Sequence, residues 1–302
     1  MRKENYSEAP IAVFVYKRPL HTARLIDSLL RNDAVSRSPV FVFCDGARAA
    51  DDNEAVAATR RVVRERLGAH CEIIERDTNW GLAASIIAGV TELTERHGRV
   101  IVLEDDLLLH SGCIEFLNAA LQRYADETRV WHVNAYRYPI PRAGAPSFSR
   151  LASSWGWATW KRAWAGFEPD AAKLAREVRR AGLVARMDFG GAFPYYAMLK
   201  SQARGRIDSW AIRWYASVLL RDGLAIYPSV SQVANGGMDG TGAHCETTSA
   251  YNVELGPASH EWPDRVIEDE ETHLQMRAYF GGVKGTVVRR VARRLMRALS
   301  TG

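Results

Sequence analysis

Residues 100–109 have the sequence VIVLEDDLLL, and this stretch decides the fold. Its first four residues are apolar and lead directly into Glu104, Asp105 and Asp106, after which apolar residues resume. A short continuous apolar run is typical of a strand that is buried on both faces. Three adjacent carboxylates at its end would repel one another unless a positive group lies among them. We expect a divalent cation, Mg2+ or Mn2+, because these ions take oxygen ligands; the alternative is a solvated acidic turn.

Strands and helices alternate around this stretch over the first 110 residues. Apolar runs predict further strands, and apolar residues at helical spacing predict helices between them. The predicted strands cover residues 11–16, 39–44 and 71–75, and the predicted helices cover residues 21–31, 54–67 and 83–96. This alternation predicts a doubly wound α/β fold with a mixed, mainly parallel sheet. Because ligands of such sheets bind at the carboxyl ends of the strands, the loops after these strands should form the site.

The second half of the chain is less regular. The expected elements are helices over 114–124, 170–187 and 209–221 and strands over 130–133 and 225–230. Residues 10–110 are interpreted as one half and residues 111–256 as the other half of the same domain. A tail of residues 1–9 precedes them, and residues 257–302 form a helical extension.

Tryptophan is unusually dense between residues 155 and 164. Such aromatic residues either fill a core or form a platform for a sugar face or a base. We expect a core position for Trp160 and Trp164, and a platform role for Trp155 or Trp157. Residues 235–244, NGGMDGTGAH, form a glycine-rich loop that either brings backbone N–H groups close to an anion or acts as a plain hinge.

The formal charge of +5 is concentrated at the C-terminus, where residues 284–299 contain six basic and no acidic side chains. The spacing over residues 287–299 predicts a basic amphipathic helix on an anionic membrane surface; the alternative is a solvated or frayed terminal helix. Scattered cysteines without a CxxC pair, no signal peptide and no long apolar run predict a cytoplasmic protein, peripheral on the inner face of the cell membrane. Nucleic-acid binding is disfavoured because the basic charge is confined to this tail.

Several familiar sites are absent from the sequence. It contains no GxxxxGK[ST], no GxGxxG after the first strand, no HExxH and no GxSxG. These absences disfavour P-loop enzymes, nicotinamide enzymes, zincins and α/β-hydrolases. An acidic strand end, a basic loop, a glycine-rich loop and aromatic residues remain, and this set suits a pyrophosphate held by a cation.

The chain resembles inverting glycosyltransferases of the GT-A fold, and is similar to bacterial relatives of the N-acetylglucosaminyltransferase I family. Five segments carry the resemblance: 10–19 (PIAVFVYKRP), 43–46 (FCDG), 79–82 (NWGL), 103–106 (LEDD) and 154–160 (SWGWATW). It spans residues 10 to about 245. It implies that residues 10–110 are the nucleotide-binding half and residues 111–256 the acceptor and catalytic half of one GT-A domain. The resemblance implies transfer of a sugar from a nucleotide-diphosphate sugar, such as a UDP-sugar, to an acceptor hydroxyl with inversion. The implied setting is bacterial surface glycan synthesis (lipopolysaccharide or capsule), with a glycan or lipid-linked glycan as acceptor.

The resemblance also implies roles for particular residues. Asp106 would ligate the metal in a DxD-type motif, and His244 is a candidate ligand or hydrogen-bonding group. Asp208 would be the catalytic base, although a helix N-cap is an equal alternative for it, and Asp188 and Asp239 are reserve candidates. The donor-binding residues would be Tyr16, Arg18, Asp45, Asn79, Gly81, Glu104 and Asp105, with Trp155 and Trp157 as platform candidates.

Two other functional classes stay open. A metal-dependent nucleotidyltransferase that makes nucleotide sugars could use a similar acidic site, but the glycine- and lysine-rich segment expected after its first strand is missing. A non-catalytic carbohydrate-binding or scaffold protein would explain the tryptophans and would leave the carboxylates unexplained.

Overall fold

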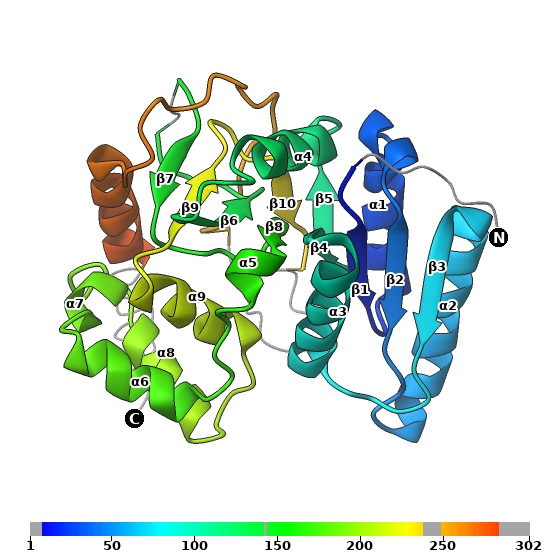
Figure 1. Cartoon of the computed structure of the whole chain (residues 1–302). Coiled ribbons are helices and arrows are strands. Elements are labelled where there is room, and N and C mark those ends of the chain that lie inside the picture. Colours follow the sequence, from blue (N-terminus) through cyan, green and yellow to red (C-terminus); the bar gives the residue numbers. More distant parts are fainter. Residues whose placement is uncertain (1–7, 142–143, 238–248, 284–302) are drawn as a thin grey trace, which may run out of the picture.

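The computed structural model describes residues 8–141, 144–237 and 249–283. Within these residues an eight-stranded sheet has the order β3-β2-β1-β4-β8-β6-β9-β7. Strands β3, β2, β1 and β4 are parallel, β6 and β9 are parallel, and β8 and β7 run antiparallel to their neighbours. The predicted mixed, mainly parallel sheet is therefore confirmed. Figure 1 shows the first half of the chain on the right and the second half on the left.

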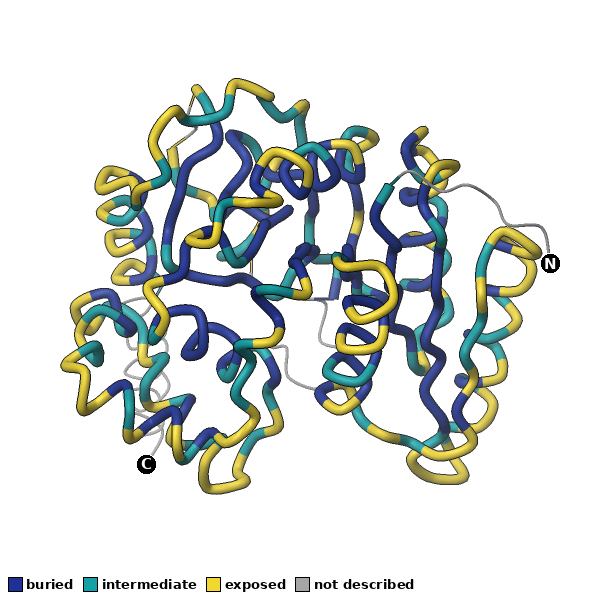
Figure 2. Tube along the Cα trace, in the orientation of Figure 1, coloured by how far each residue is buried: buried dark blue, intermediate teal, exposed yellow. Residues whose placement is uncertain are grey.

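The first four strands form where unbroken apolar runs were expected. They are β1 (Ile11–Val15), β2 (Val40–Cys44), β3 (Cys71–Glu75) and β4 (Arg99–Glu104). Every residue of β1 and β2 is buried, because both faces of this part of the sheet are covered by helices. Figure 2 shows the contrast between the buried strands and the exposed outer turns of the helices.

Helices cover both faces of the sheet. On one face lie α1 (Pro19–Leu29), α2 (Asn53–Leu67) and α4 (Cys113–Arg123), whose apolar side chains share a core cluster with the strands. On the other lie α3 (Leu82–His97), α5 (Lys161–Trp164) and α9 (Trp210–Leu220). A third cluster joins α6 (Ala171–Arg180), α8 (Tyr195–Ala203) and the helix of residues 270–283 to α9.

The second half departs from the predictions in several places. Its strands in the large sheet are β6 (Val130–Asn134), β7 (Ser147–Ser149), β8 (Trp157–Trp160) and β9 (Leu224–Tyr227), of which β7 and β8 were not predicted. The single helix predicted over residues 170–187 is wrong. It is split into α6 and α7 (Val184–Met187), because Gly182 between them adopts a left-handed φ of 71° that ends the first helix.

A small two-stranded sheet links the acidic stretch to the glycine-rich loop. Strand β5 (Leu107–Leu109) follows the carboxylates directly and pairs antiparallel with β10 (Val233–Asn235). Short 3-10 helices η1 (Asp33–Arg37), η2 (Ala50–Asp52) and η3 (Gly68–His70) complete the connections. No described helix is long and apolar enough to cross a membrane. The basic segment of residues 284–299 lies outside the described residues, so its membrane role stays a prediction.

Candidate functional site

The three carboxylates lie where β4 ends, at the carboxyl edge of the parallel strands. The positive group among them is Arg18, which follows β1. Its Nη2 donates to Asp105 Oδ1 at 2.7 Å and to Asp106 Oδ2 at 2.9 Å. Asp105 is only 7% exposed, so this ion pair is largely removed from water. An arginine of this chain therefore supplies part of the positive charge that the acidic sequence requires.

Arg18 leaves the site incompletely satisfied. Glu104 Oε1, Asp106 Oδ1 and Arg18 Nη1 are buried and have no hydrogen-bond partner within the described chain. Buried polar atoms are nearly always hydrogen-bonded, so such a group of unpartnered atoms indicates a place for a ligand. Two of these atoms are carboxylate oxygens at one strand end.

The pKa values of the three acids follow from this environment. Burial, then Asp106 and Asp105, raise the pKa of Glu104 well above its ordinary value. Burial raises the pKa of Asp105 to about 6, and Arg18 opposes this rise. Burial also raises the pKa of Asp106, again opposed by Arg18. The ionised carboxylates are thus short of positive charge, which favours a further cation.

The start of the glycine-rich loop lies directly over the acids. Gly236 N donates to the backbone oxygen of Asp106 at 2.7 Å, and Gly237 N donates to Asn235 Oδ1 at 2.7 Å. A Cβ at Gly237 would lie 2.5 Å from Asp106 Oδ2 and 2.9 Å from Arg18 Nη1. Only glycine fits this approach. The rest of the loop, with Asp239 and His244, lies outside the described residues.

A divalent cation fits the donor chemistry of this site. Glu104 and Asp106 would hold it through their unpartnered carboxylate oxygens, the ligand type that Mg2+ and Mn2+ prefer. Among the residues that the structure describes, no cluster of three or more His, Cys, Asp or Glu is arranged to bind a metal by itself. A cation here would therefore draw further oxygen ligands from water or from a bound phosphate.

Tyr16 and Asp45 organise the neighbouring loops. The Tyr16 hydroxyl donates to Asp52 Oδ2 at 2.6 Å and accepts from Arg48 N at 3.0 Å, which joins the loop after β1 to the loop after β2. Tyr16 therefore lies at the carboxyl edge, directly after β1, the strand next to β4.

Asp45 holds the loop that leads into α3. Its carboxylate accepts from Asn79 Nδ2 at 3.1 Å and from the backbone N–H groups of Trp80 and Gly81 at 2.9 Å each. Gly81 is the N-cap of α3 with a φ of 78°, a conformation that favours glycine. In the free protein Asp45 and Asn79 thus bind each other and this loop, and their predicted contacts with a nucleotide stay predictions.

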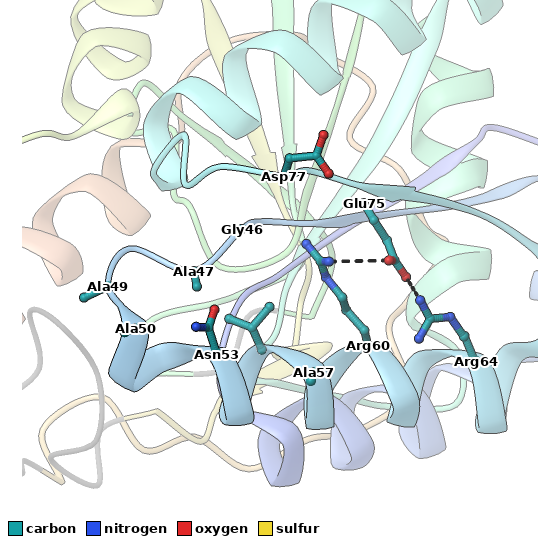
Figure 3. Close-up of a pocket in the computed structure, with 11 residues that line it drawn as sticks. Gly46, Ala47, Ala49, Ala50, Asn53, Ala57, Arg60, Arg64, Glu75 and Asp77 are labelled. Carbon is teal, nitrogen blue, oxygen red and sulfur yellow. Dashed lines mark hydrogen bonds and ion pairs between the residues drawn. The ribbon is translucent and has the colours of Figure 1, made fainter.

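A cavity of about 650 Å3 opens beside Asp45, at the carboxyl ends of β2 and β3. Figure 3 shows α2 forming one wall, from which Arg60 and Arg64 reach toward Glu75 of β3. Small alanine side chains from the β2–α2 loop and α2 leave the space open. Only β1 separates β2 from β4, so these strand ends lie about 10 Å apart. The lining residues are Gly46, Ala47, Ala49, Ala50, Asn53, Val56, Ala57, Arg60, Arg64, Glu75 and Asp77.

The platform role predicted for Trp157 is wrong. Trp157 is 0% exposed. Its ring stacks on the rings of His132 and Trp210, with distances between ring centroids of 5.2 Å and 4.9 Å. Trp155 is half-buried and lies edge-on to Tyr136 at 4.6 Å. Gly156, with a φ of 64°, breaks the usual alternation, so the two tryptophans pack into different clusters. The core positions predicted for Trp160 and Trp164 are confirmed, as both are buried.

The exposed tryptophan of the site region is Trp80, which the sequence interpretation did not single out. It is 52% exposed, and the Arg76 guanidinium covers its ring at 4.0 Å. The sequence signal is a single aromatic residue between Asn79 and Gly81, in a loop that follows a strand.

Asp208 lies just before α9 and is exposed. Its carboxylate accepts from Arg213 Nη2 at 3.4 Å. The N-cap of α9 is Ser209, whose Oγ accepts from Ile212 N at 3.3 Å, so the N-cap alternative for Asp208 is wrong. The reserve candidate Asp188 accepts from Tyr196 N at 2.7 Å and so holds the first turn of α8.

The packing of α9 determines where Asp208 lies relative to the acids. Trp210, two residues after Asp208, stacks on Trp157 of β8. Trp157 pairs in register with Val102, two residues before Glu104. Val102, Trp157 and Trp210 share one core cluster, so α9 begins on the sheet face to which β4 contributes Val102.

Comparison with protein-family models gives no match, and neither does comparison with curated sequences. Among solved structures, the mannosyltransferase PcManGT from Pyrobaculum calidifontis in complex with GDP-Man and Mn2+ is 17% identical, over 72% of this chain and 78% of that chain, with a TM-score of 0.35. GalNAc-T7 with UDP, GalNAc and Mn2+ is 9% identical, over 76% of this chain and 44% of that chain, with a TM-score of 0.47. S. aureus TarS is 14% identical over 44% of this chain and 23% of that chain, with a TM-score of 0.30. Because these TM-scores are all below 0.5, the likenesses do not support a function, which must be inferred from the residues of this chain.

Proposed function

We propose that this chain is a glycosyltransferase that uses a nucleotide-diphosphate sugar and a divalent cation. The observation that supports this most is the pair of unpartnered carboxylate oxygens of Glu104 and Asp106 at the end of β4. Ligands of open α/β sheets bind at this edge. A cation that needs phosphate oxygens to complete its ligand set links the acids to a diphosphate.

The donor would extend along the carboxyl edge of the sheet. Its diphosphate would lie beside Arg18, next to the start of the glycine-rich loop, where a guanidinium suits an anion. Its nucleoside would lie toward the cavity at the ends of β2 and β3, near Tyr16 and Asp45. The separation of β2 from β4 leaves room for an extended nucleotide between them.

The transfer step would be a single displacement with inversion. Asp208 would take the proton from the acceptor hydroxyl while the acceptor oxygen bonds to the anomeric carbon and the bond to the diphosphate oxygen breaks. Arg213 would orient the Asp208 carboxylate. A bound divalent cation would offset the negative charge of the leaving diphosphate. Arg18 and the glycine-rich loop would bind the same diphosphate.

The acceptor side follows from the resemblance and from the C-terminal segment. A glycan or lipid-linked glycan of a bacterial surface polymer, such as lipopolysaccharide or capsule, is the proposed acceptor. The basic residues between 284 and 299 would hold the protein at the inner face of the membrane where such lipids lie. A nucleotidyltransferase is the second class, and it would release pyrophosphate from a nucleoside triphosphate.

A thermal-shift panel tests the proposal. UDP, GDP, UTP, GTP and common nucleotide sugars would each be added with Mn2+ and with EDTA. A ligand that binds only the folded state raises the melting temperature by mass action. We expect a Mn2+-dependent shift with one nucleoside diphosphate and its sugar derivative. A shift with the triphosphates alone would favour the nucleotidyltransferase, and no shift with any nucleotide would contradict both.

A further inference from the structure

The ion pair between Arg18 and the two aspartates uses one oxygen of Asp106, and a cation would use the other oxygen of the same carboxylate. We infer that Arg18 is a displaceable counter-ion, which neutralises Asp105 and Asp106 in the free protein and turns to the diphosphate when a divalent cation and a nucleotide enter together. This inference rests on the proposed function. It assigns Arg18 a part in coupling cation binding to nucleotide binding, beyond contact with the donor.

Arg18 and a divalent cation would compete for the negative charge of Asp106. Arg18 Nη2 already contacts Asp106 Oδ2 at 2.9 Å, while Asp106 Oδ1 has no partner among the described residues. A divalent cation on Asp106 would therefore lie within a few ångströms of the guanidinium. Two positive groups at that distance repel strongly in a partly buried site. Either the cation is excluded or Arg18 moves away.

The backbone of Arg18 is fixed, whereas its side chain is held only by the ion pair with the two aspartates. Its backbone is fixed at the start of α1, where Thr22 N donates to the Arg18 carbonyl oxygen at 2.9 Å. Its guanidinium contacts the acids through Nη2, whereas Nη1 is buried without a partner. The side chain is 20% exposed, and the hydrogen bonds of its guanidinium go to the two carboxylates and not to the backbone.

The unpartnered Nη1 of Arg18 faces the start of the glycine-rich loop. A Cβ at Gly237 would lie 2.9 Å from Nη1, so the loop backbone packs closely on the guanidinium there. The same backbone lies over Asp106. A diphosphate oxygen that contacts Nη1 would give it the charge-assisted hydrogen bond that it lacks.

A thermodynamic consequence follows. Cation alone must displace Arg18 without compensation, whereas cation with a diphosphate offers Arg18 a new partner. The two ligands should therefore bind cooperatively, and each raises the affinity of the other by the same factor. Removal of the guanidinium charge should abolish most of this coupling.

The test is titration of the full-length protein with Mn2+ by calorimetry, alone and with saturating UDP or GDP, in wild type and Arg18→Gln. We expect Arg18→Gln to bind Mn2+ alone about tenfold more tightly than wild type, and to bind the nucleotide in Mn2+ about tenfold more weakly. Arg18→Lys should have affinities for Mn2+ and for the nucleotide that lie between those of wild type and Arg18→Gln. Arg24→Gln, the same charge change at an exposed position of α1, should leave both affinities within about twofold.

The outcomes separate this inference from the proposed function. If wild type binds Mn2+ with a nucleotide and folded Arg18→Gln binds Mn2+ alone no better than wild type, the counter-ion role is overturned and the function stands. If wild type binds Mn2+ equally well with and without the nucleotide, the coupling is overturned, and this measurement needs no variant. If neither protein binds Mn2+ or nucleotide, the proposed function fails as well. If Arg18→Gln does not fold, the inference is tested by the Mn2+ and nucleotide affinities of Arg18→Lys and by the coupling measured in wild type.

Discussion

Trp214 donates its indole N–H to Nδ1 of His132 at 3.0 Å, in the interior between α9 and β6. The other ring nitrogen, Nε2, lies 3.0 Å from Asn134 Oδ1, so a neutral imidazole with its proton on Nε2 satisfies both contacts. Asn134 Oδ1 also accepts from Ser153 N at 2.8 Å. This network fixes the segment that leads into the tryptophan strand β8.

His132 predicts a specific pH dependence of stability. Burial lowers its pKa from 6.5 to about 3. The unfolded chain therefore gains a proton as pH falls below 6.5, while the folded protein gains it only near 3, so stability falls with pH across this window. His132 lowers the free energy of unfolding by up to about 1.4 kcal/mol for each pH unit within this window.

The measurement is chemical denaturation of wild type and His132→Gln across that window. We expect the variant to be less stable at neutral pH and to show a shallower decline as pH falls. His70→Gln, at an exposed position, should keep the wild-type slope. An unchanged slope in His132→Gln would show that another group causes the acid sensitivity.

Truncation of Trp157 and of Trp80 should lower stability by different amounts. Trp157 is fully buried, and Trp157→Ala should lower the free energy of unfolding by about 3–5 kcal/mol. Trp80 is 52% exposed and contacts Arg76, so Trp80→Ala should cost only about 1 kcal/mol, the value of a cation–π contact. Denaturant titration measures both, and equal losses would contradict the core assignment of Trp157.

Gly237 is predicted to be essential to the site. A Cβ there would meet Asp106 Oδ2 at 2.5 Å, so Gly237→Ala must push the loop away from the acids. We expect at least about tenfold weaker nucleotide binding in Mn2+, equivalent to about 1.4 kcal/mol. The control is Gly281→Ala, where a Cβ meets no atom within 4 Å and binding should not change. Equal affinity in both variants would place the nucleotide elsewhere.

Asp208 is predicted to act in transfer only. Asp208→Asn should bind the donor normally and lower kcat by about 100-fold or more, the usual contribution of a general base. Ser209→Ala, which removes the actual helix cap, should instead cost about 1 kcal/mol of stability and leave kcat unchanged. Steady-state kinetics and thermal melts of both variants separate the two roles. Wild-type turnover in Asp208→Asn would eliminate it as the base.

Much of the first half could be predicted because β1 to β4 are strands whose sequences are largely continuous apolar runs. The predicted segments differ from the observed strands by one residue at most at either end. Strand β8 was missed because its four residues contain two tryptophans, a pattern equally typical of a core loop. Strands β5 and β10 have three residues each, too few to show a period.

The loops that form the site could be predicted from the sequence, whereas the contacts between their side chains could not. The acids and the basic residue after β1 do converge, as their positions at strand ends implied, and the first residues of the glycine-rich loop lie beside them. That Arg18 would contact Asp105 and Asp106 depends on side-chain rotamers and strand spacing, which a one-dimensional pattern does not contain. The same limit explains Trp157, because the left-handed turn at Gly156 decides which cluster receives it.

The most direct test of the central claim is calorimetric binding of the nucleotide found by the thermal-shift panel to wild type and Asp106→Asn, in Mn2+ and in EDTA. Asp106→Asn keeps the shape of the side chain and removes its charge. We expect Mn2+-dependent binding by wild type and a loss of that dependence in a folded Asp106→Asn. Equal, Mn2+-dependent affinity in both proteins would contradict the assignment of the acids at the end of β4 as the cation site.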